Sequence, residues 1–182
     1  GLRNAGMAPI AKHFPGHGAV AADSHERLPI DRREYGDVLD DIRPYGKLIG
    51  NGLIVGVMLS HIIYSEIDVL PAGFSRYWIQ SELRSRLGFG GAVFCDDLNM
   101  KATESYGTMP TRAKLALEAG CDMVLICNNR PAAQAVVSSL KEYSNPLSLV
   151  RLARLHGSGQ ISRESLLASE KWQSAAKRFI DW

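Results

Sequence analysis

Four short apolar runs, each about the length of a β-strand, recur along this chain and constrain its fold more than any other feature. The runs are Met7–Ala11, Leu53–Leu59, Ala92–Cys95 and Met123–Cys127. None of them alternates polar with apolar residues, so each run indicates a strand that is buried on both faces. The runs therefore predict a sheet that is covered on both sides.

The segments between these runs have helical character. They are Arg32–Lys47, Ser75–Leu87, Thr111–Ala119 and Pro131–Tyr143. Strands that alternate with long crossover helices are parallel, so we expect an α/β fold. A (β/α)8 TIM-type barrel has about 250 residues. Four strands therefore correspond to the C-terminal half of such a barrel, and we expect the other half to lie upstream of Gly1.

The pattern changes from Ser144 onward. Pro146–Leu155, Ser162–Ser169 and Glu170–Ile180 have helical patterns with no strand between them. We therefore expect two regions: residues 1–143 as the C-terminal part of the barrel catalytic domain, and residues 144–182 as a helical extension packed on the barrel.

Composition excludes several classes of partner. The chain has 21 basic and 19 acidic residues, a net charge of +2, and it has no basic stripe with interleaved aromatic residues, which argues against a nucleic acid partner. No apolar run approaches the roughly 18 residues of a membrane span. The cysteines Cys95, Cys121 and Cys127 form no CxxC pair and are expected to be buried free thiols in a reducing compartment.

Polar side chains follow each apolar run. They are Lys12-His13, Ser60-His61, Asp96-Asp97 and Asn128-Asn129-Arg130. In parallel α/β folds the carboxyl ends of the strands meet at one edge of the sheet, and active sites are built there. We therefore expect an active site at this edge.

The segment Lys12–Gly18, continued to His25, contains three histidines and Asp23. One hypothesis is a metal site made by His13, His17, Asp23 and His25, which are suitable ligand types. Their spacing matches no common metal-binding pattern, and a glycine-rich loop is a poor rigid cage. A second hypothesis is acid/base chemistry, in which the carboxylate of Asp23 orients the imidazole of His25 and supports its charged form.

Asp96 directly follows a rigid apolar run. A carboxylate held in this way suits a nucleophile at a sugar anomeric carbon, where an oxocarbenium-like transition state needs a close negative charge. Side chains alternate along an extended chain, so Asp97 is expected to point the opposite way and to make structural hydrogen bonds.

The motif Lys12-His13-Phe14-Pro15-Gly16-His17-Gly18 with Asp23-Ser24-His25 resembles the signature of glycoside hydrolase family 3, in its bacterial β-N-acetylhexosaminidase branch. The segments 60–64, 87–100 and 119–130 also resemble this family. The resemblance implies that Asp96 is the nucleophile, His25 the general acid/base and Asp23 its supporting carboxylate. It also implies that Lys12 and His13 bind the terminal N-acetylglucosamine, and that no metal or cofactor takes part.

The resemblance further implies a cytoplasmic exo-hydrolase with a small-molecule substrate. It would remove non-reducing N-acetylglucosamine from muropeptides bearing 1,6-anhydro-N-acetylmuramic acid, in peptidoglycan recycling. Other sugar-binding residues of the family lie in the first half of the barrel, so we expect that this half is needed and that the isolated chain is poorly stable and weakly active. The alternatives are a metal-dependent hydrolase that uses the histidine-rich loop, or an inactive barrel fragment.

Overall fold

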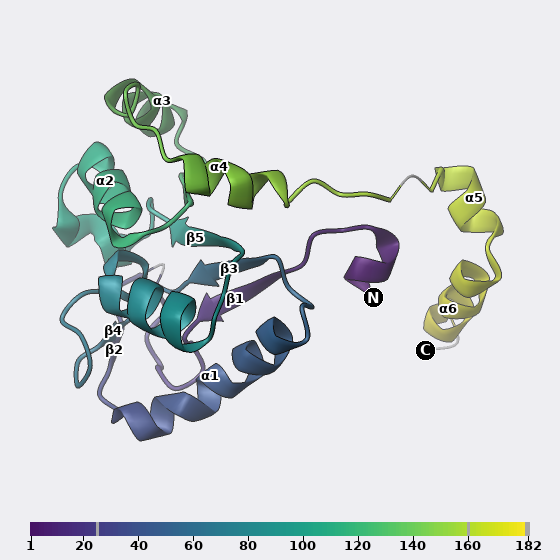
Figure 1. The fold of residues 1–182 in the computed structure, drawn as a ribbon, viewed down its shortest axis with the longest axis horizontal. Helices are drawn as coiled ribbons and strands as arrows, with labels where there is room; N and C mark the ends of the chain where they lie inside the picture. Colours follow the sequence, from purple (N-terminus) through teal and green to yellow (C-terminus); the bar gives the residue numbers. More distant parts are fainter. Residues whose placement is uncertain (25, 160, 181–182) are drawn as a thin grey trace. The chain divides into compact units, whose positions relative to one another are not determined.

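The chain divides into two compact units in the computed structural model, which describes residues 1–24, 26–159 and 161–180. The larger unit is Ala8–His156, and the smaller unit combines Gly1–Met7 with Gly157–Trp182 (Figure 1). The expected boundary between residues 143 and 144 separates the barrel from the helical extension. The division into compact units falls at other positions and does not test that boundary, which stays a prediction.

A four-stranded parallel sheet with the strand order β1-β3-β5-β6 forms the centre of the larger unit (Figure 1). The strands are β1 (Ile10–Phe14), β3 (Gly56–Leu59), β5 (Ala92–Asp97) and β6 (Met123–Leu125). The expected α/β fold with four parallel strands is confirmed. Within the described residues the sheet does not close, so β1 and β6 form its two edges.

The first strand lies three residues later than the apolar run Met7–Ala11 predicts. Its register is set by pairing with β3, from Ile10 opposite Gly56 to Phe14 opposite Leu59. The apolar run covers the residues before the strand and the first two residues of the strand. Backbone pairing with β3 decides which residues form the strand. Lys12 and His13 therefore lie within β1 and not after it.

A second, two-stranded parallel sheet pairs β2 (Ile30–Asp31) with β4 (Ile63–Tyr64). These strands could not be predicted from the sequence, because two residues are too few to show a hydropathy period. This small sheet connects the end of the histidine-containing loop to the segment that follows β3.

Helices of several types connect the strands or follow the last strand, β6. They are α1 (Tyr35–Gly50), η2 (Ala72–Phe74), the π-type helix η3 (Tyr77–Arg86), η4 (Lys101–Tyr106), α2 (Met109–Ala119), α3 (Arg130–Ser139) and α4 (Pro146–Ala153). In α2, the hydroxyl of Thr108 caps the first turn by accepting from the amide of Thr111. The same helix ends at Gly120, whose φ of 119° is unfavourable for other residues. The helix therefore ends where the expected helical segment Thr111–Ala119 ends.

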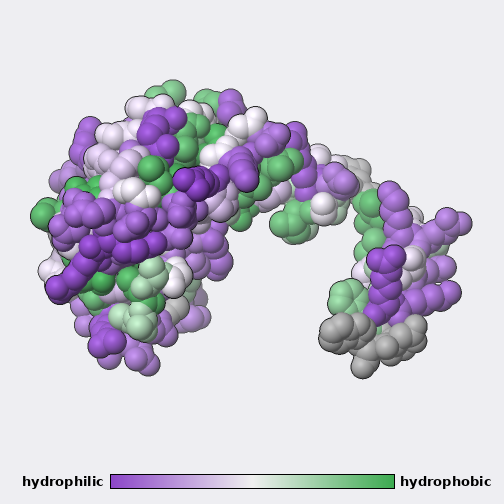
Figure 2. All heavy atoms as spheres, turned by 90° about the horizontal axis from the view of Figure 1, so that it is seen from below, coloured by the Kyte–Doolittle hydropathy of each residue, from purple (hydrophilic) through white to green (hydrophobic). Residues whose placement is uncertain are grey.

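Aromatic side chains fill the space between the sheet and its helices. Phe14 of β1 packs edge-to-face on Tyr45 of α1 and on Trp78 of η3, and Trp78 also contacts Tyr64. Phe14, Tyr64 and Trp78 are fully buried, and each such side chain contributes about 1.5–3 kcal/mol of hydrophobic stabilisation. The view over α1 in Figure 2 shows a mainly hydrophilic outer surface with scattered hydrophobic groups. This core holds the strands that carry the polar residues at their carboxyl ends.

The amino end of β6 is joined to α4 by a buried charge network. Asp122 accepts hydrogen bonds from Arg84, Arg151, the hydroxyl of Ser148 and the amide of Val93. This network lies at the end of β6 opposite to the expected active site.

The smaller unit is helical. Its elements are η1 (Leu2–Ala5), α5 (Arg163–Ala168) and α6 (Glu170–Ile180). The amide of Ser158 donates to the carbonyl of Gly6, and the hydroxyl of Ser162 caps α5 by accepting from the amide of Ser165. Across the described parts of both units, the helices are too short or too polar to cross a bilayer.

Candidate active site

Asp96 and Asp97 are the last two residues of β5 and make different contacts. Asp97 Oδ1 accepts hydrogen bonds from the amides of Asn99 and Cys127, both at 2.9 Å. These bonds hold the loop after β5 against the end of β6, so the expected structural role of Asp97 is confirmed. Asp96 Oδ1 accepts from the amide of Asp97 at 2.8 Å, and its side chain keeps 18% of its surface exposed. Asp96 therefore presents a carboxylate oxygen at the carboxyl end of the sheet.

His13 of β1 lies beside this carboxylate, with Nε2 3.5 Å from Asp96 Oδ2. The two residues are brought together across β3, which lies between β1 and β5. The pairing of β1 with β3 shifts between Lys12 and Phe14, so His13 occupies a β-bulge. Bulges redirect a side chain relative to the regular alternation of a strand. Lys12, the other predicted sugar-binding residue, is exposed on the same strand.

The loop after β1 is anchored at its base. The hydroxyl of Tyr64 donates a hydrogen bond to the carbonyl of Gly16. A Cβ atom on Gly16 would lie 2.6 Å from the Cβ of Asp41 on α1, so only glycine allows this close approach. Gly16 in the glycine-rich loop therefore serves close packing against α1.

The far part of the loop is docked on the segment that follows Asp96. The buried hydroxyl of Ser24 lies 3.2 Å from His17 Nε2, and the carbonyl of Ser24 accepts a hydrogen bond of 3.3 Å from the amide of Ala102 in η4. The carbonyl of Asp23 accepts from the amides of Glu26 and Arg27. His25, the predicted acid/base, lies outside the described residues. Ser24, which precedes it in the motif, is thus placed on the segment after the predicted nucleophile.

His61 is a further polar residue at this edge, to which the sequence analysis assigned no role. It lies two residues beyond the end of β3 and is fully buried, in contact with the ring of Phe74 at 5.6 Å between centroids. Burial lowers the pKa of His61, and the negative charge of Asp96 opposes this only in part. The imidazole is therefore neutral at neutral pH. Its position after the run Leu53–Leu59 was visible in the sequence, but its burial depends on residues of other elements.

The cysteines only partly match the expectation of buried thiols. Cys95 and Cys121 are buried, whereas Cys127 is exposed because it lies in the loop after β6. Burial raises the pKa of the Cys95 thiol, so it is protonated and unreactive beneath Asp96.

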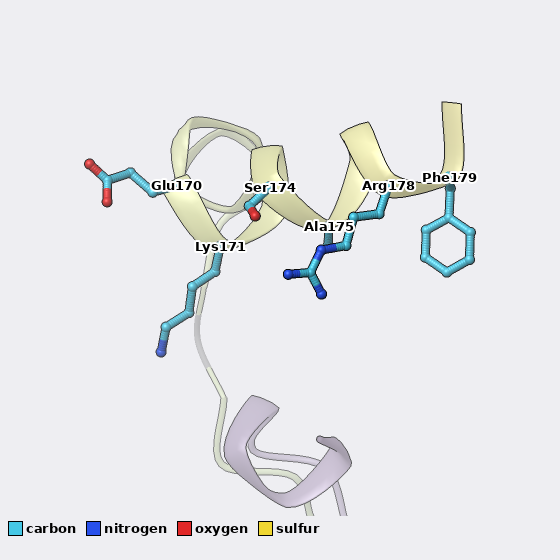
Figure 3. Close-up of a pocket in the computed structure, with 6 residues that line it drawn as sticks. All are labelled: Glu170, Lys171, Ser174, Ala175, Arg178 and Phe179. Atoms are coloured by element: carbon cyan, nitrogen blue, oxygen red, sulfur yellow. The ribbon is translucent and has the colours of Figure 1, made fainter. Parts of the chain in front are cut away.

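The described residues 1–24, 26–159 and 161–180 contain no group of three or more histidine, cysteine or acidic residues arranged to hold a metal ion. Of the proposed ligand set, His13, His17 and Asp23 are among these residues, whereas His25 is not. A cavity of about 780 Å³ lies along α6, where Lys171, Arg178 and Phe179 extend from the same side of the helix (Figure 3). It contains none of the predicted catalytic residues.

Comparison with known proteins gives a family match over most of the chain. Residues 1–155 match the glycosyl hydrolase family 3 N-terminal domain. A β-hexosaminidase of Thioalkalivibrio sulfidiphilus is 49% identical over 175 residues, which cover 96% of this chain and 50% of that protein. A β-hexosaminidase of Hydrogenovibrio crunogenus is 48% identical and covers 97% of this chain and 49% of that protein.

Solved structures agree with this match. The structure of NagZ from Neisseria gonorrhoeae has a TM-score of 0.83 and 33% identity, covering 94% of this chain and 50% of that one. A family 3 β-N-acetylglucosaminidase from Paenibacillus has a TM-score of 0.81 and 26% identity, covering 97% and 37%. The chain spans about half the length of the curated relatives it matches. From the geometry of the sheet edge and these matches, we conclude that the chain belongs to glycosyl hydrolase family 3 and corresponds to part of its N-terminal domain.

Proposed function

We propose that this chain supplies the catalytic half of a retaining exo-β-N-acetylglucosaminidase. One observation carries the proposal. Asp96 lies beside His13 of β1, while Ser24, between Asp23 and His25 in the sequence, is hydrogen-bonded to the segment that follows Asp96. The segment that contains His13 and the segment that contains Ser24 therefore both contact the region of Asp96. This region lies at the carboxyl end of the sheet, where parallel α/β enzymes build their active sites.

The proposed reaction has two steps. An oxygen of Asp96 attacks the anomeric carbon and forms a glycosyl-enzyme ester, while His25, supported by Asp23, protonates the departing oxygen. Neutral His25 then takes a proton from water, the water oxygen attacks the anomeric carbon, and the bond to Asp96 breaks. Two inversions give net retention. Lys12 and His13 bind the terminal sugar, and no cofactor is involved.

The proposed substrate is a small glycoside with a terminal N-acetylglucosamine. The names of the relatives support hexosaminidase activity. The motif resemblance supports the narrower assignment to muropeptides that carry 1,6-anhydro-N-acetylmuramic acid, to peptidoglycan recycling and to the cytoplasm. We also propose that the remaining strands of a barrel are needed, because the chain spans half of its relatives and the sheet has two edges in the described residues.

The test uses a chromogenic N-acetyl-β-glucosaminide with two proteins: the chain as given, and a complete barrel in which the family's remaining strands precede it. We expect activity in the complete barrel with retention at the anomeric centre, followed by NMR. Asp96→Ala should reduce kcat on the order of 10⁴-fold or more, as loss of a catalytic group does in other hydrolases. The matched control is Asp40→Asn, at an exposed aspartate of α1.

Full activity of Asp96→Ala would exclude Asp96 as the nucleophile. Loss of activity with a chelator, restored by zinc, would favour the metal-dependent alternative. An inactive complete barrel would favour the inert-fragment alternative.

A further inference from the structure

His17 is a residue of the histidine-containing motif to which the proposed reaction gives no role. Its ring packs edge-to-face on the ring of His13, with 6.1 Å between the ring centroids and 67° between the planes. Its Nε2 atom lies 3.2 Å from the hydroxyl oxygen of Ser24, farther along the same loop. The imidazole of His17 therefore contacts both a residue of β1 and a residue next to His25 in the sequence.

Each of these two contacts leads on to the region of Asp96. On one side, His13 Nε2 is 3.5 Å from Asp96 Oδ2. On the other side, Ser24 is buried, and its carbonyl accepts a hydrogen bond from the amide of Ala102 in η4, the helix that follows β5. His17 thus completes a continuous series of contacts that begins at the end of β5 and returns to the segment after it.

The chain between His17 and Asp23 has few means of holding itself in place. Residues 18–22 are glycine, alanine and valine, whose side chains form no hydrogen bonds. A side-chain hydrogen bond across this segment must therefore come from the residues that flank it, and the pair of His17 and Ser24 supplies one. The base of the loop is fixed separately, through the carbonyl of Gly16.

We propose that His17 is a positioning residue for the acid/base histidine: through Ser24, its imidazole holds the part of the loop that brings His25 to a sugar bound at Asp96. This inference rests on the proposed function. An imidazole suits the task because one rigid ring can pack on His13 and still hydrogen-bond through Nε2. The hydroxyl of Ser24 can donate to this nitrogen or accept from it, so the contact forms with either tautomer of the neutral ring.

The first test compares two substrates of the complete barrel by kcat/KM, which reports the step that forms the glycosyl-enzyme. The leaving group of a dinitrophenyl N-acetyl-β-glucosaminide departs without a proton, whereas that of the phenyl glycoside needs the acid. His17→Phe keeps an aromatic ring and removes Nε2. It should lower the ratio of the phenyl to the dinitrophenyl kcat/KM about 10-fold, because a poorly placed acid slows only the first substrate. A general structural loss would lower both values equally.

Matched variants separate the hydrogen bond from the ring. His17→Gln places an amide group near the position of Nε2 and should restore most of the ratio, whereas the shorter His17→Asn should not. Ser24→Ala removes the same contact from the other side and should lower the ratio as much as His17→Phe does, with no further fall in the double variant. His156→Phe, at an exposed histidine, should leave the ratio unchanged.

The second test needs no activity and follows amide hydrogen exchange by NMR, in the complete barrel and in the chain as given. In His17→Phe, the amide of Ala102 should exchange about 5-fold faster, the effect of one net hydrogen bond lost from its partner Ser24. The amide of Leu98, which donates to the carbonyl of Leu125 on β6, should keep its rate, which would show that the change is local.

An unchanged substrate ratio, or an unchanged exchange rate at Ala102, in a folded His17→Phe would overturn the inference. If that variant does not fold, an unchanged ratio in Ser24→Ala would overturn it. The two proposals can also fail separately. If the wild-type complete barrel is inactive while the exchange at Ala102 responds to His17, the proposed function fails and the holding of the loop by His17 stands. If the wild type is active and the ratio does not respond to His17, the positioning role fails and the proposed function stands.

Discussion

At the scale of single residues, the carboxylates of Asp96 and Asp97 follow one another on β5 yet contact different groups. Asp97 is occupied by the amides of Asn99 and Cys127. Asp96 keeps an oxygen within 3.5 Å of His13. Alternation along a strand accounts for this division, which is why the sequence alone could predict which aspartate is structural.

Ser24 joins the loop to the segment after Asp96, the proposed nucleophile. Replacing Ser24 by Ala removes its contact with His17, so the part of the loop that carries Asp23 and His25 should be held less well. We expect kcat of the complete barrel to fall roughly 10-fold, because loosely held catalytic groups spend less time in reactive geometry. The matched control is Ser138→Ala on the exposed face of α3. Equal kcat in both variants would show that this contact does not position the loop.

His61 should make stability depend on pH. Its pKa is lowered in the folded state by burial, so below the unfolded value of about 6.5 the unfolded chain binds more protons. The free energy of unfolding should therefore fall as the pH drops below about 6.5. Urea unfolding at several pH values should show a weaker fall in His61→Asn than in the wild type. The exposed His156→Asn should leave the fall unchanged, and an unchanged fall in His61→Asn would contradict the expectation.

The candidate site could be predicted from the sequence where the signal is local. The strand-end position of Asp96 and the motif around His17 are of this kind. The burial of His61 could not be predicted, because it depends on Gly73 and Phe74 in another element. The hydrogen bond between Ser24 and Ala102 could not be predicted either, because it joins residues far apart in the chain.

At the scale of elements, Asp122 connects β6, η3 and α4. Its side chain is fully buried and is paired with Arg84 and Arg151. Asp122→Ala would leave buried positive charge unpaired, so we expect a loss of about 3–5 kcal/mol in the free energy of unfolding, measured with urea. The exposed pair of Lys114 and Glu118 provides the control, since Glu118→Ala should cost at most about 0.5 kcal/mol. Similar losses in the two variants would contradict the role of this network.

The elements themselves were largely predictable from periodicity. The helix α2 ends at Ala119, as the segment Thr111–Ala119 predicts, and α5 lies within the expected segment Ser162–Ser169. The position of β1 was not predictable from hydropathy, because pairing with β3 and the bulge at His13 fix it. The short strands β2 and β4 carry too few residues to leave a pattern.

At the scale of the whole molecule, the open edges of the sheet should limit the isolated chain. Ile10 on β1 and Met123 on β6 are 41% and 36% exposed, and unpaired edge strands favour association. We expect the chain alone to give a broad, concentration-dependent melt in calorimetry and the complete barrel to give a cooperative one. A cooperative, monomeric melt of the isolated chain would show that no further strands are needed for folding.

The proposed reaction depends on a covalent bond between Asp96 and the sugar. The most direct measurement is to treat the complete barrel with a fluorinated N-acetylglucosamine derivative that traps the glycosyl-enzyme, and then to locate the added mass by peptide mass spectrometry. We expect one sugar per chain, on Asp96, and none in Asp96→Ala. Hydrolysis of the substrate with the label on another residue, or with no covalent label in the wild type, would contradict it.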